Sequence, residues 1–522
     1  MRALARPRGA LCGISALLAA AALASCAVGP NYRTPAVRVP GHYTALTSAP
    51  ATAIRVAGNA TSGAYLASWW SLLRDPELDS LVERAVANNP NVILALDRLQ
   101  AARLYEAGLT GTVAPVAEAN AAYGQGTGQD LTRATAVPAL REGDNSHSLT
   151  HLTTVGGFDA VWEIDLFGRI RREIEQARYD TEAAADARNA VLVSVIADVA
   201  QAYVDLRGLQ LRAGVLQSAS AALTQDVTIV TQRFQRGITN ELDVALAQRE
   251  LGSINAQIPI LNAEVSSGEY AIATLLGQYP EDLVAELSTP AMIPAVPGSV
   301  STGLPLDLLR RRPDVQEAER AIASENAGIG IATADLFPQV IATGGIGFQQ
   351  GVIGTSTVGQ HIWSAGPGVI WPLLDFGQLD ARVQIANVRT QAALENYKAT
   401  VETAVREVDS DAARFLAAES SIASLNEALV ASQRAVTLAN ERYNRGLTDY
   451  LNVVAAEDAE YSIEEQYIQT QAGVDDQLVQ LYRDLGGGWQ GFQKVPPIAR
   501  PLPAIMAIFR DTLARTDALK DP

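Results

Sequence analysis

The sequence predicts a mixed α and β membrane protein built from two matching halves, in which four transmembrane β-strands continue into long, coiled α-helices. Three observations predict this fold: an internal repeat, four stretches that alternate like strands, and two very long helical stretches. In the repeat, RFQRGITNELDV (233–244) matches RYNRGLTDYLNV (442–453), and WEIDLFG (162–168) matches WPLLDFG (371–377), each pair 209 positions apart. This spacing indicates the duplication of one structural unit rather than a short-period solenoid.

The repeat begins further upstream, with a different offset. NNPNV (88–92) matches RRPDV (311–315), and Pro115 matches Pro338, in both cases 223 positions apart. The first copy therefore holds additional residues between Pro115 and Trp162, and we place them in a longer loop near DNSHSLTH.

The N-terminus has the features of a lipoprotein signal peptide. A basic stretch without acids precedes a short apolar run that ends in LASC, Leu23 to Cys26. This arrangement is typical of a secretory signal rather than of a membrane span. We predict cleavage after residue 25 and acylation of the Cys26 thiol, because two or more acyl chains give stable anchoring. Ala27 is not the Asp that favours retention in the inner membrane, so we expect the outer membrane.

Composition limits the partners and the chemistry. The formal net charge is −17, which argues against nucleic acid as a partner. Removal of the signal, which contains Cys12, leaves one cysteine and therefore no internal disulfide. The glycine-rich stretches are too loose to be phosphate loops. The chain is not expected to be an enzyme, and we predict no catalytic residue, no metal site and no cofactor beyond the lipid, although four histidines are present: His42, His147, His151 and His361.

The repeat and the composition divide the chain into successive segments. They are a signal peptide (1–25), an extended segment (26–66), short helices (67–111), a β-hairpin (112–164), a long helical hairpin (165–285), a linker (286–302), and then short helices (303–336), a β-hairpin (337–375), a long helical hairpin (376–487) and a tail (488–522). In the second set of short helices one apolar face is expected to be buried; it consists of Val315, Ala318, Ile322 and Ile329.

The four strand segments alternate with a period of two and have aromatic residues near their ends. Segments of about ten residues with this pattern are typical of lipid-facing strands in a membrane barrel, although a soluble hairpin also alternates. The predicted lipid-facing residues are Val113, Ala117, Ala121 and Tyr123; Leu152, Phe158, Ala160 and Trp162; Val340, Ala342, Ile346 and Phe348; and Trp363, Ala365, Val369, Trp371 and Leu373.

Each β-hairpin is followed by a stretch long enough for a helix of roughly 100 Å, at 1.5 Å per residue. Gly237 and Gly446 permit the left-handed backbone that ends such a helix. Thr239 and Thr448, with Asn240 and Asp449 beside them, are candidates to cap the returning helix. The first returning helix carries a heptad seam, with a kink expected at Pro259; the seam consists of Leu251, Ile254, Ile258, Leu261, Val265, Ile272 and Leu275.

Four strands are too few to close a membrane barrel, and an open edge in lipid leaves backbone groups unpaired. Several chains are therefore expected to pool their strands. An eight-stranded barrel from two chains is filled by its own side chains, so an open conduit favours three chains. An acylated periplasmic coiled-coil scaffold without a pore is the alternative function, but it does not explain the alternating segments.

Several long motifs resemble the outer-membrane efflux factor family, that is, TolC-like proteins, and within it the NodT-type lipoproteins that are associated with RND pumps. The motifs are GPNYRTP (29–35), AQAYVDLRGLQLR (200–212), RRPDVQEAERAIASENAGIGIATADLFPQV (311–340), WPLLDFGQ (371–378) and DLGGGW (484–489). The resemblance implies a homotrimer with a twelve-stranded barrel in the outer membrane and a helical tunnel in the periplasm. It also implies a duct for drugs or other small molecules, with two partners: an inner-membrane pump and a periplasmic adaptor that grips the helical tips.

The same resemblance suggests which residues dock the adaptor and which form a gate. The expected tip residues are Arg236, Gly237, Thr239, Arg445, Gly446 and Thr448. The two tip arginines could instead complement the C-terminus of a helix. Relatives often have a pore-lining Asp nine residues after the second tip glycine, but this chain has Ala455 there. The candidate gate residues are instead Asp243, Asn452, Glu457 and Asp458.

Overall fold

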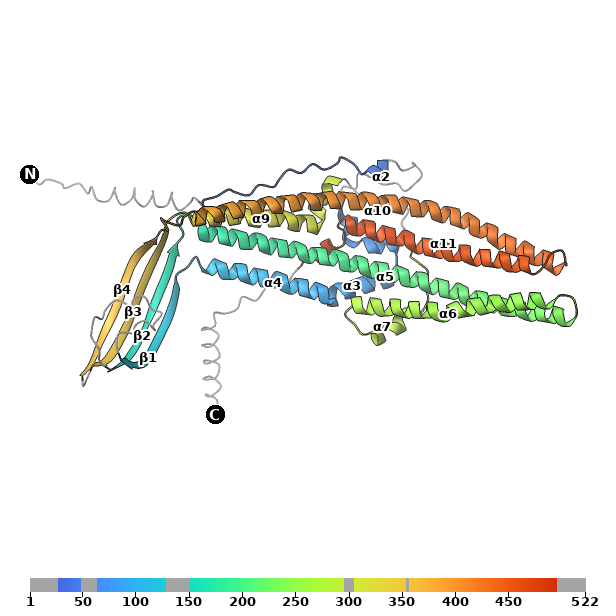
Figure 1. The fold of residues 1–522 in the computed structure, drawn as a ribbon, viewed down its shortest axis with the longest axis horizontal. Helices are drawn as coiled ribbons and strands as arrows, with labels where there is room; N and C mark the ends of the chain where they lie inside the picture. The colour runs from blue at the N-terminus through green and yellow to red at the C-terminus, as the bar shows by residue number, and fades with distance from the viewer. Residues whose placement is uncertain (1–26, 48–62, 128–149, 295–304, 354–355, 495–522) are drawn as a thin grey trace, which may run out of the picture.

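A computed structural model of the chain describes residues 27–47, 63–127, 150–294, 305–353 and 356–494. A four-stranded sheet lies at one end, and long helices extend from it to two turns at the opposite end (Figure 1). The predicted acylation site Cys26, the signal peptide and most of the C-terminal tail lie outside the described residues.

The sheet is antiparallel and has the order β1-β2-β3-β4. Its strands are β1 (Val116–Thr127), β2 (Thr150–Ile164), β3 (Gln339–Ile353) and β4 (Ser356–Ile370). Two predicted strand bounds were wrong. Val113 precedes β1, and Trp371 and Leu373 follow β4, which ends two residues before Pro372, a residue without an N–H to donate.

One face of the sheet is apolar from edge to edge. The register places Ala119 opposite Phe158, Phe158 opposite Ile346, and Ile346 opposite Trp363. Facing residues point to the same side of a sheet, so the predicted lipid-facing sets combine into one surface. The side chain of Leu152 lies outside those described. The opposite face carries polar residues in the alternate rows, among them Glu118, Asp159 and Ser364.

The two halves have the same strand register. Ala119 pairs with Phe158 in the first half. Their counterparts at offsets of 223 and 209, Ala342 and Pro367, pair in the second half. The tryptophans near the ends of β2 and β4 also correspond. Trp162 Nε1 donates to the Val113 oxygen at 3.0 Å, and Trp371 Nε1 donates to the Leu336 oxygen at 3.2 Å.

Two helical hairpins form the rest of the length. The first consists of α5 (Arg169–Gln235) and α6 (Glu241–Leu275), and the second of α10 (Gln378–Asn444) and α11 (Leu451–Asp484). Both long helices contain 67 residues and begin after a glycine with positive φ, Gly168 at 86° and Gly377 at 85°. The α6 seam faces the interior, with Ile254, Leu261 and Ile272 buried and the other seam residues half-buried. Pro259 lies inside α6.

Shorter helices lie beside the sheet-proximal half of each long helix. The predicted short helices of the first half (67–111) include α3 (Pro76–Asn88) and α4 (Pro90–Gly111), which are separate because Asn89 adopts an extended backbone and caps α4. Its counterpart α9 (Pro313–Ala334) buries the predicted residues Val315, Ala318, Ile322 and Ile329. The remaining elements are α2 (Thr44–Thr47), η1 (Gly63–Leu73), α7 (Pro280–Leu287), η4 (Pro305–Asp307), α8 (Leu308–Arg311) and η5 (Trp489–Phe492).

The largest hydrophobic core lies midway along the helices, where short and returning helices meet. It joins η1, α3, α5, α6, α9, α10 and α11 around Trp69, which stacks on Tyr482 at 5.4 Å between ring centroids. One stretch of α5 is long and apolar enough to cross a membrane, but 61% of it is buried inside the chain. That burial is typical of a core helix.

The N-terminal segment from residue 27 begins where the sheet joins the helices and continues along their outer side (Figure 1). The Val28 N–H donates to the Phe167 oxygen at 3.1 Å. Further along, the Tyr32 hydroxyl donates to Glu319 on α9, and the Ala45 N–H donates to Asp409 on α10 at 2.7 Å. The segment is therefore fixed to both halves.

Candidate functional site

Each helical hairpin ends in a turn with the same hydrogen bonds. At the first tip, the Gly237 N–H donates to the Phe234 oxygen at 2.8 Å and the Ile238 N–H to the Arg233 oxygen at 2.9 Å. This pair of bonds defines a Schellman motif, in which the glycine takes a left-handed backbone. Gly237 has a φ of 72°.

The second tip repeats this geometry. The Gly446 N–H donates to the Tyr443 oxygen and the Leu447 N–H to the Arg442 oxygen, both at 2.9 Å, and Gly446 has a φ of 70°. A β-carbon on Gly237 or Gly446 would meet no atom within 4 Å. Backbone conformation alone, and not space, therefore requires glycine at the two tips.

The two tips differ in how the returning helix begins. Asn240 caps α6, since its Oδ1 accepts from the Asp243 N–H at 3.0 Å, and the Thr239 hydroxyl donates to the Asp243 carboxylate. At the second tip, Tyr450 holds the capping position without a side-chain hydrogen bond. The predicted cap at Asp449 was therefore wrong.

The second cap is lost because Tyr450 turns inward. Its ring is 2% exposed and lies 5.2 Å from that of Tyr443, and Arg233 lies 4.5 Å over the Tyr443 ring. The two tyrosines belong to a small core that joins both hairpins near their tips, with Val230 from α5 and Val453 from α11. The tips are thus held together by apolar packing.

An exposed pair of aliphatic residues lies at each tip and was missed by the sequence analysis. Ile238 and Leu242 are 60% and 63% exposed, and their counterparts Leu447 and Leu451 are 63% and 56% exposed. The repeated tip sequence contained a signal for this pair. In both copies an aliphatic residue follows the glycine, on a surface where polar residues are normal. The predicted tip residues Arg236 and Arg445 are also exposed.

The four candidate gate residues fall into two environments. Asp243 and Glu457 are buried, at 7% and 6% exposure, whereas Asn452 and Asp458 are exposed. The Asn452 amide donates to the Thr448 hydroxyl at 2.8 Å. The structure therefore does not bring the four side chains together on one surface, although all four lie in the returning helices near the tips.

Buried carboxyl groups lie between the two hairpins just above the tips. Burial, followed by the charge of Asp226 on α5, raises the pKa of Glu457 on α11 to about 7. Burial, followed by a hydrogen bond with Asp458 on α11, also raises the pKa of Glu250 on α6. Each of these acid pairs joins the first hairpin to the second. Two carboxyl groups in contact do not both ionise readily.

The described part of the chain contains no group of three or more His, Cys, Asp or Glu side chains placed to hold a metal ion. His147, one of the histidines considered above, lies outside it. Among the side chains that recur in both halves are those of the tips, the sheet face and the tryptophans near the ends of β2 and β4. These are surfaces for contact rather than sets of reactive groups.

Comparisons with known proteins agree with this arrangement. The sequence profile described as "Outer membrane efflux protein" matches residues 81–278 and 304–487. Nodulation protein T of Rhizobium leguminosarum bv. trifolii is 28% identical over 83% of this chain and 88% of its own length. Outer membrane protein OprJ of Pseudomonas aeruginosa is 29% identical over 91% and 96%, respectively.

Solved structures show the same fold. The outer-membrane channel OprN superimposes with a TM-score of 0.77 and 34% identity, covering 89% of this chain and all of that one. The open state of the Neisseria gonorrhoeae channel MtrE superimposes with a TM-score of 0.71 over 90% of this chain and all of that one, at 24% identity. With a family match over most of its length and a channel fold, this chain belongs to the outer membrane efflux protein family.

Proposed function

We propose that this chain is the outer-membrane exit duct of a tripartite efflux system, passing drugs or other small molecules that an inner-membrane pump delivers through a periplasmic adaptor. The main observation in support is that a sheet with one apolar face continues directly into two matched helical hairpins. In this proposal the duct is passive, and the apolar sheet face and the tips serve as surfaces for contact.

The sheet supports insertion in the membrane. Its apolar face exposes large side chains that a water-soluble sheet would cover, including Tyr123 at 73%, Phe158 at 65% and Trp363 at 77%. The opposite face carries Glu118 and Asp159. Apolar residues outside and polar residues inside are the pattern of a membrane barrel with a water-filled lumen.

Three chains complete the barrel. The sheet order leaves β1 and β4 each with one unpaired edge within the chain, and unpaired edges are not tolerated in lipid. Three copies supply twelve strands, enough for an open lumen, whereas eight strands would be filled by side chains.

The start of the described chain supports acylation at Cys26. Ala27 lies against Gly168, between β2 and α5: a β-carbon on Gly168 would be 2.6 Å from the Ala27 Cα. Residue 27, which directly follows the predicted acylation site in the sequence, therefore lies at the boundary between the sheet and the helices. That boundary is the level of the periplasmic membrane surface in the proposed orientation, so a lipid on Cys26 inserts beside the barrel.

The tips are the proposed docking surface for the adaptor. Each presents an arginine, a left-handed glycine and an exposed aliphatic pair, and three chains present six such tips. For the gate we retain the four predicted residues in two roles. Exposed Asn452 and Asp458 face the lumen, while buried Asp243 and Glu457 hold the tips in shape.

A conductance measurement tests the duct. Protein extracted in mild detergent should migrate as a trimer on an unheated gel and give single-channel steps in a planar bilayer. A monodisperse monomer with full strand content by circular dichroism would contradict the assembly. An assembled trimer without conductance would favour the acylated scaffold instead.

A further inference from the structure

A cavity of about 200 Å³ lies between the two helical hairpins, a few helical turns from the tips towards the sheet. The first hairpin supplies part of its wall, including Arg212 on α5 and Glu250 on α6. The second hairpin supplies the rest from α11, including Asp458. A molecule in the cavity would therefore touch both hairpins at once.

One side of the cavity is aliphatic. Ile254 and Leu261 on α6 and Ile468 on α11 line it, and they are only 5%, 4% and 7% exposed. Contact with such side chains removes apolar ligand surface from water, which stabilises binding. This side of the cavity therefore suits the apolar body of a ligand.

Two carboxyl groups in contact form another part of the wall. Glu250 on α6 and Asp458 on α11 both line the cavity, and a hydrogen bond joins their side chains. Glu250 is 5% exposed and pairs with Arg249 at 3.1 Å, but Arg249 is 58% exposed. Because solvent weakens an ion pair with an exposed arginine, Arg249 offsets little of the negative charge at the cavity.

Arg212 on α5, a base in the same wall, is already paired. It forms an ion pair with Glu465 on α11, and both residues line the cavity. These two charges offset each other. The net charge of the wall is therefore negative and is concentrated at Glu250 and Asp458.

A wider groove of about 720 Å³ adjoins the cavity, and both are lined by Val215 and Tyr461. The groove also has Glu460 and Glu464 in its lining, and none of its described lining residues is a lysine or an arginine. A cleft with charge of one sign attracts ions of the opposite sign. Cations are therefore concentrated beside the cavity, where Tyr461 supplies an aromatic ring that also attracts them.

We propose that this cavity binds a small organic cation, with its ammonium group at the carboxyl pair of Glu250 and Asp458 and its apolar body against the aliphatic side. The volume is below the roughly 300 Å³ at which pockets for drug-sized molecules begin. The ligand is therefore a compact amine. Since the wall belongs to both hairpins, the bound amine holds the first hairpin against the second and stabilises this arrangement.

The site is complete within one chain, because α5, α6 and α11 supply the residues described above. Asp458 is exposed, and in the proposed duct it faces the lumen, so the amine enters from there. This direction of entry rests on the proposed function. Binding itself does not.

The bound amine takes the place of a proton. Burial, followed by the hydrogen bond with Asp458, raises the pKa of Glu250, against a lowering by Arg249. The other charged groups in the wall, Arg212 and Glu465, are paired with each other. A primary amine stays protonated to about pH 10, whereas Glu250 gains its charge as the pH rises. The affinity for an amine should therefore increase from about pH 5 to about pH 8.

Calorimetric titration of the detergent-extracted protein with phenethylamine tests the site. The amine should bind and raise the unfolding temperature, because it stabilises the folded state. Phenethyl alcohol, an uncharged analogue of the same shape, should bind about tenfold more weakly or not at all, since a hydrogen bond to a charged group contributes more than a neutral one. Equal affinity for the amine and the alcohol would overturn the inference, as would absence of binding by the amine.

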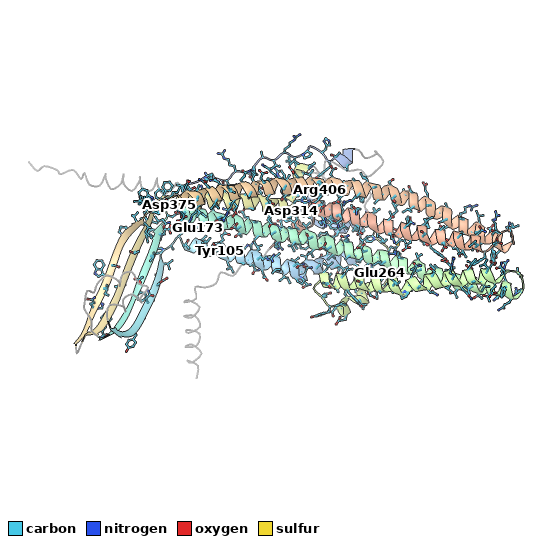
Figure 2. The ribbon with its side chains drawn as sticks, viewed as in Figure 1. Tyr105, Glu173, Glu264, Asp314, Asp375 and Arg406 are labelled. Atoms are coloured by element: carbon cyan, nitrogen blue, oxygen red, sulfur yellow. The ribbon has the colours of Figure 1, made fainter. Side chains whose placement is uncertain are left out.

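Variants of the carboxyl pair locate the site. Glu250→Gln and Asp458→Asn keep the shape of the side chain without its charge, so each should lower the affinity for phenethylamine about tenfold. Asp458 is exposed, so its variant is the one with less effect on folding. Glu264→Gln is the matched control, because Glu264 is an exposed acid of the same helix α6 outside the cavity lining (Figure 2).

Each variant is first confirmed to assemble like the unaltered protein on an unheated gel. Unchanged affinity in Glu250→Gln and Asp458→Asn, or an equal loss in Glu264→Gln, would overturn the inference. Conductance in a planar bilayer is a separate measurement, so failure of amine binding leaves the proposed duct intact, and absence of conductance leaves the amine site intact.

Discussion

Gly330 on α9 lies so close to Arg172 on α5 that a β-carbon at Gly330 would sit 2.7 Å from the arginine side chain. Arg172 has little freedom to move away. Its guanidinium donates to the Val28 oxygen at 3.1 Å and to Asn31 at 2.9 Å, and it pairs with Glu175 at 2.7 Å. The N-terminal segment thus fixes the arginine against the glycine.

Gly330→Ala should therefore destabilise the sheet-proximal helices by about 1 to 3 kcal/mol, the usual cost of overpacking. Gly328→Ala is the matched control, because its β-carbon would be 3.6 Å from the Gln176 amide, an ordinary contact. The measurement is the temperature at which each trimer dissociates on a gel. Equal loss in both variants would mean that helix flexibility, and not the Arg172 contact, decides the effect.

Alanine or valine at Gly237 or Gly446 should impair export more than assembly. A β-carbon in a left-handed backbone costs roughly 1 kcal/mol, which is small for a trimer, and neither position has a neighbour to collide with. Susceptibility to exported compounds should rise while trimer abundance stays normal. Asparagine, which tolerates this backbone, should restore export.

A glycine in the sheet provides the opposite case. A β-carbon on Gly157 would be 2.7 Å from the Ile346 oxygen and 3.0 Å from the Gly347 Cα. Gly157→Ala should therefore reduce the assembled trimer itself. If the tip variants lost trimer while the surviving trimers exported normally, the tips would be folding elements and not a docking surface.

Glu457→Gln should stabilise the protein at pH 8 and weaken its pH dependence. Burial and the charge of Asp226 raise the pKa of Glu457 from 4.5 to about 7, and Glu460 adds to the effect. The folded state therefore binds more protons than the unfolded state between these values. Its contribution to stability is complete below about pH 4.5 and is lost as the pH rises to about 7.

Unfolding temperatures of the detergent-extracted protein, followed from pH 5 to 8, measure this effect. Glutamine imitates the protonated acid, so the variant should gain a few degrees at pH 8 and little at pH 5. Exposed Glu427→Gln on α10 controls for the change in net charge. A variant that is less stable at pH 8 than the unaltered protein would show that the carboxylate form is the favourable one.

Cys26→Ser should give a chain without lipid that keeps its strands. The residue that follows Cys26 lies at the junction of sheet and helices, so the anchor is expected to speed insertion rather than to shape the fold. Mass spectrometry of the mature N-terminus should find an acylated Cys26 in the unaltered protein. An unmodified N-terminus at any other residue would refute the anchor.

Patterns of long range in the sequence predicted the architecture well. The period-two stretches combined into one apolar face, and each predicted long helical hairpin contains two long helices. These features depend on repetition along the backbone, which a sequence displays directly. Turn chemistry was less predictable: Asn240 caps its helix as expected, but Asp449 does not, because Tyr450 packs against Tyr443 instead.

The gate candidates show a second limit. Burial distinguishes Glu457 from its neighbour Asp458, and burial depends on how α11 rotates against α5 and α6. The spacing of residues within α11 does not determine that rotation. The contacts of Glu457 with Asp226, and of Asp458 with Glu250, join positions more than two hundred residues apart, so neither pair could be recognised from the sequence alone.

The equal length of α5 and α10 restricts how the gene can change. Each residue adds 1.5 Å to a helix, so the loss of one heptad from a single half would withdraw its tip by about 10 Å, and alternate points of the docking ring would no longer be level. An insertion or deletion in one long helix must then be matched by an equal change in the other, because an unmatched change would be lost by selection. The region between Pro115 and Trp162, where the copies differ in length, is free of this restriction, and variation in length among relatives should collect there.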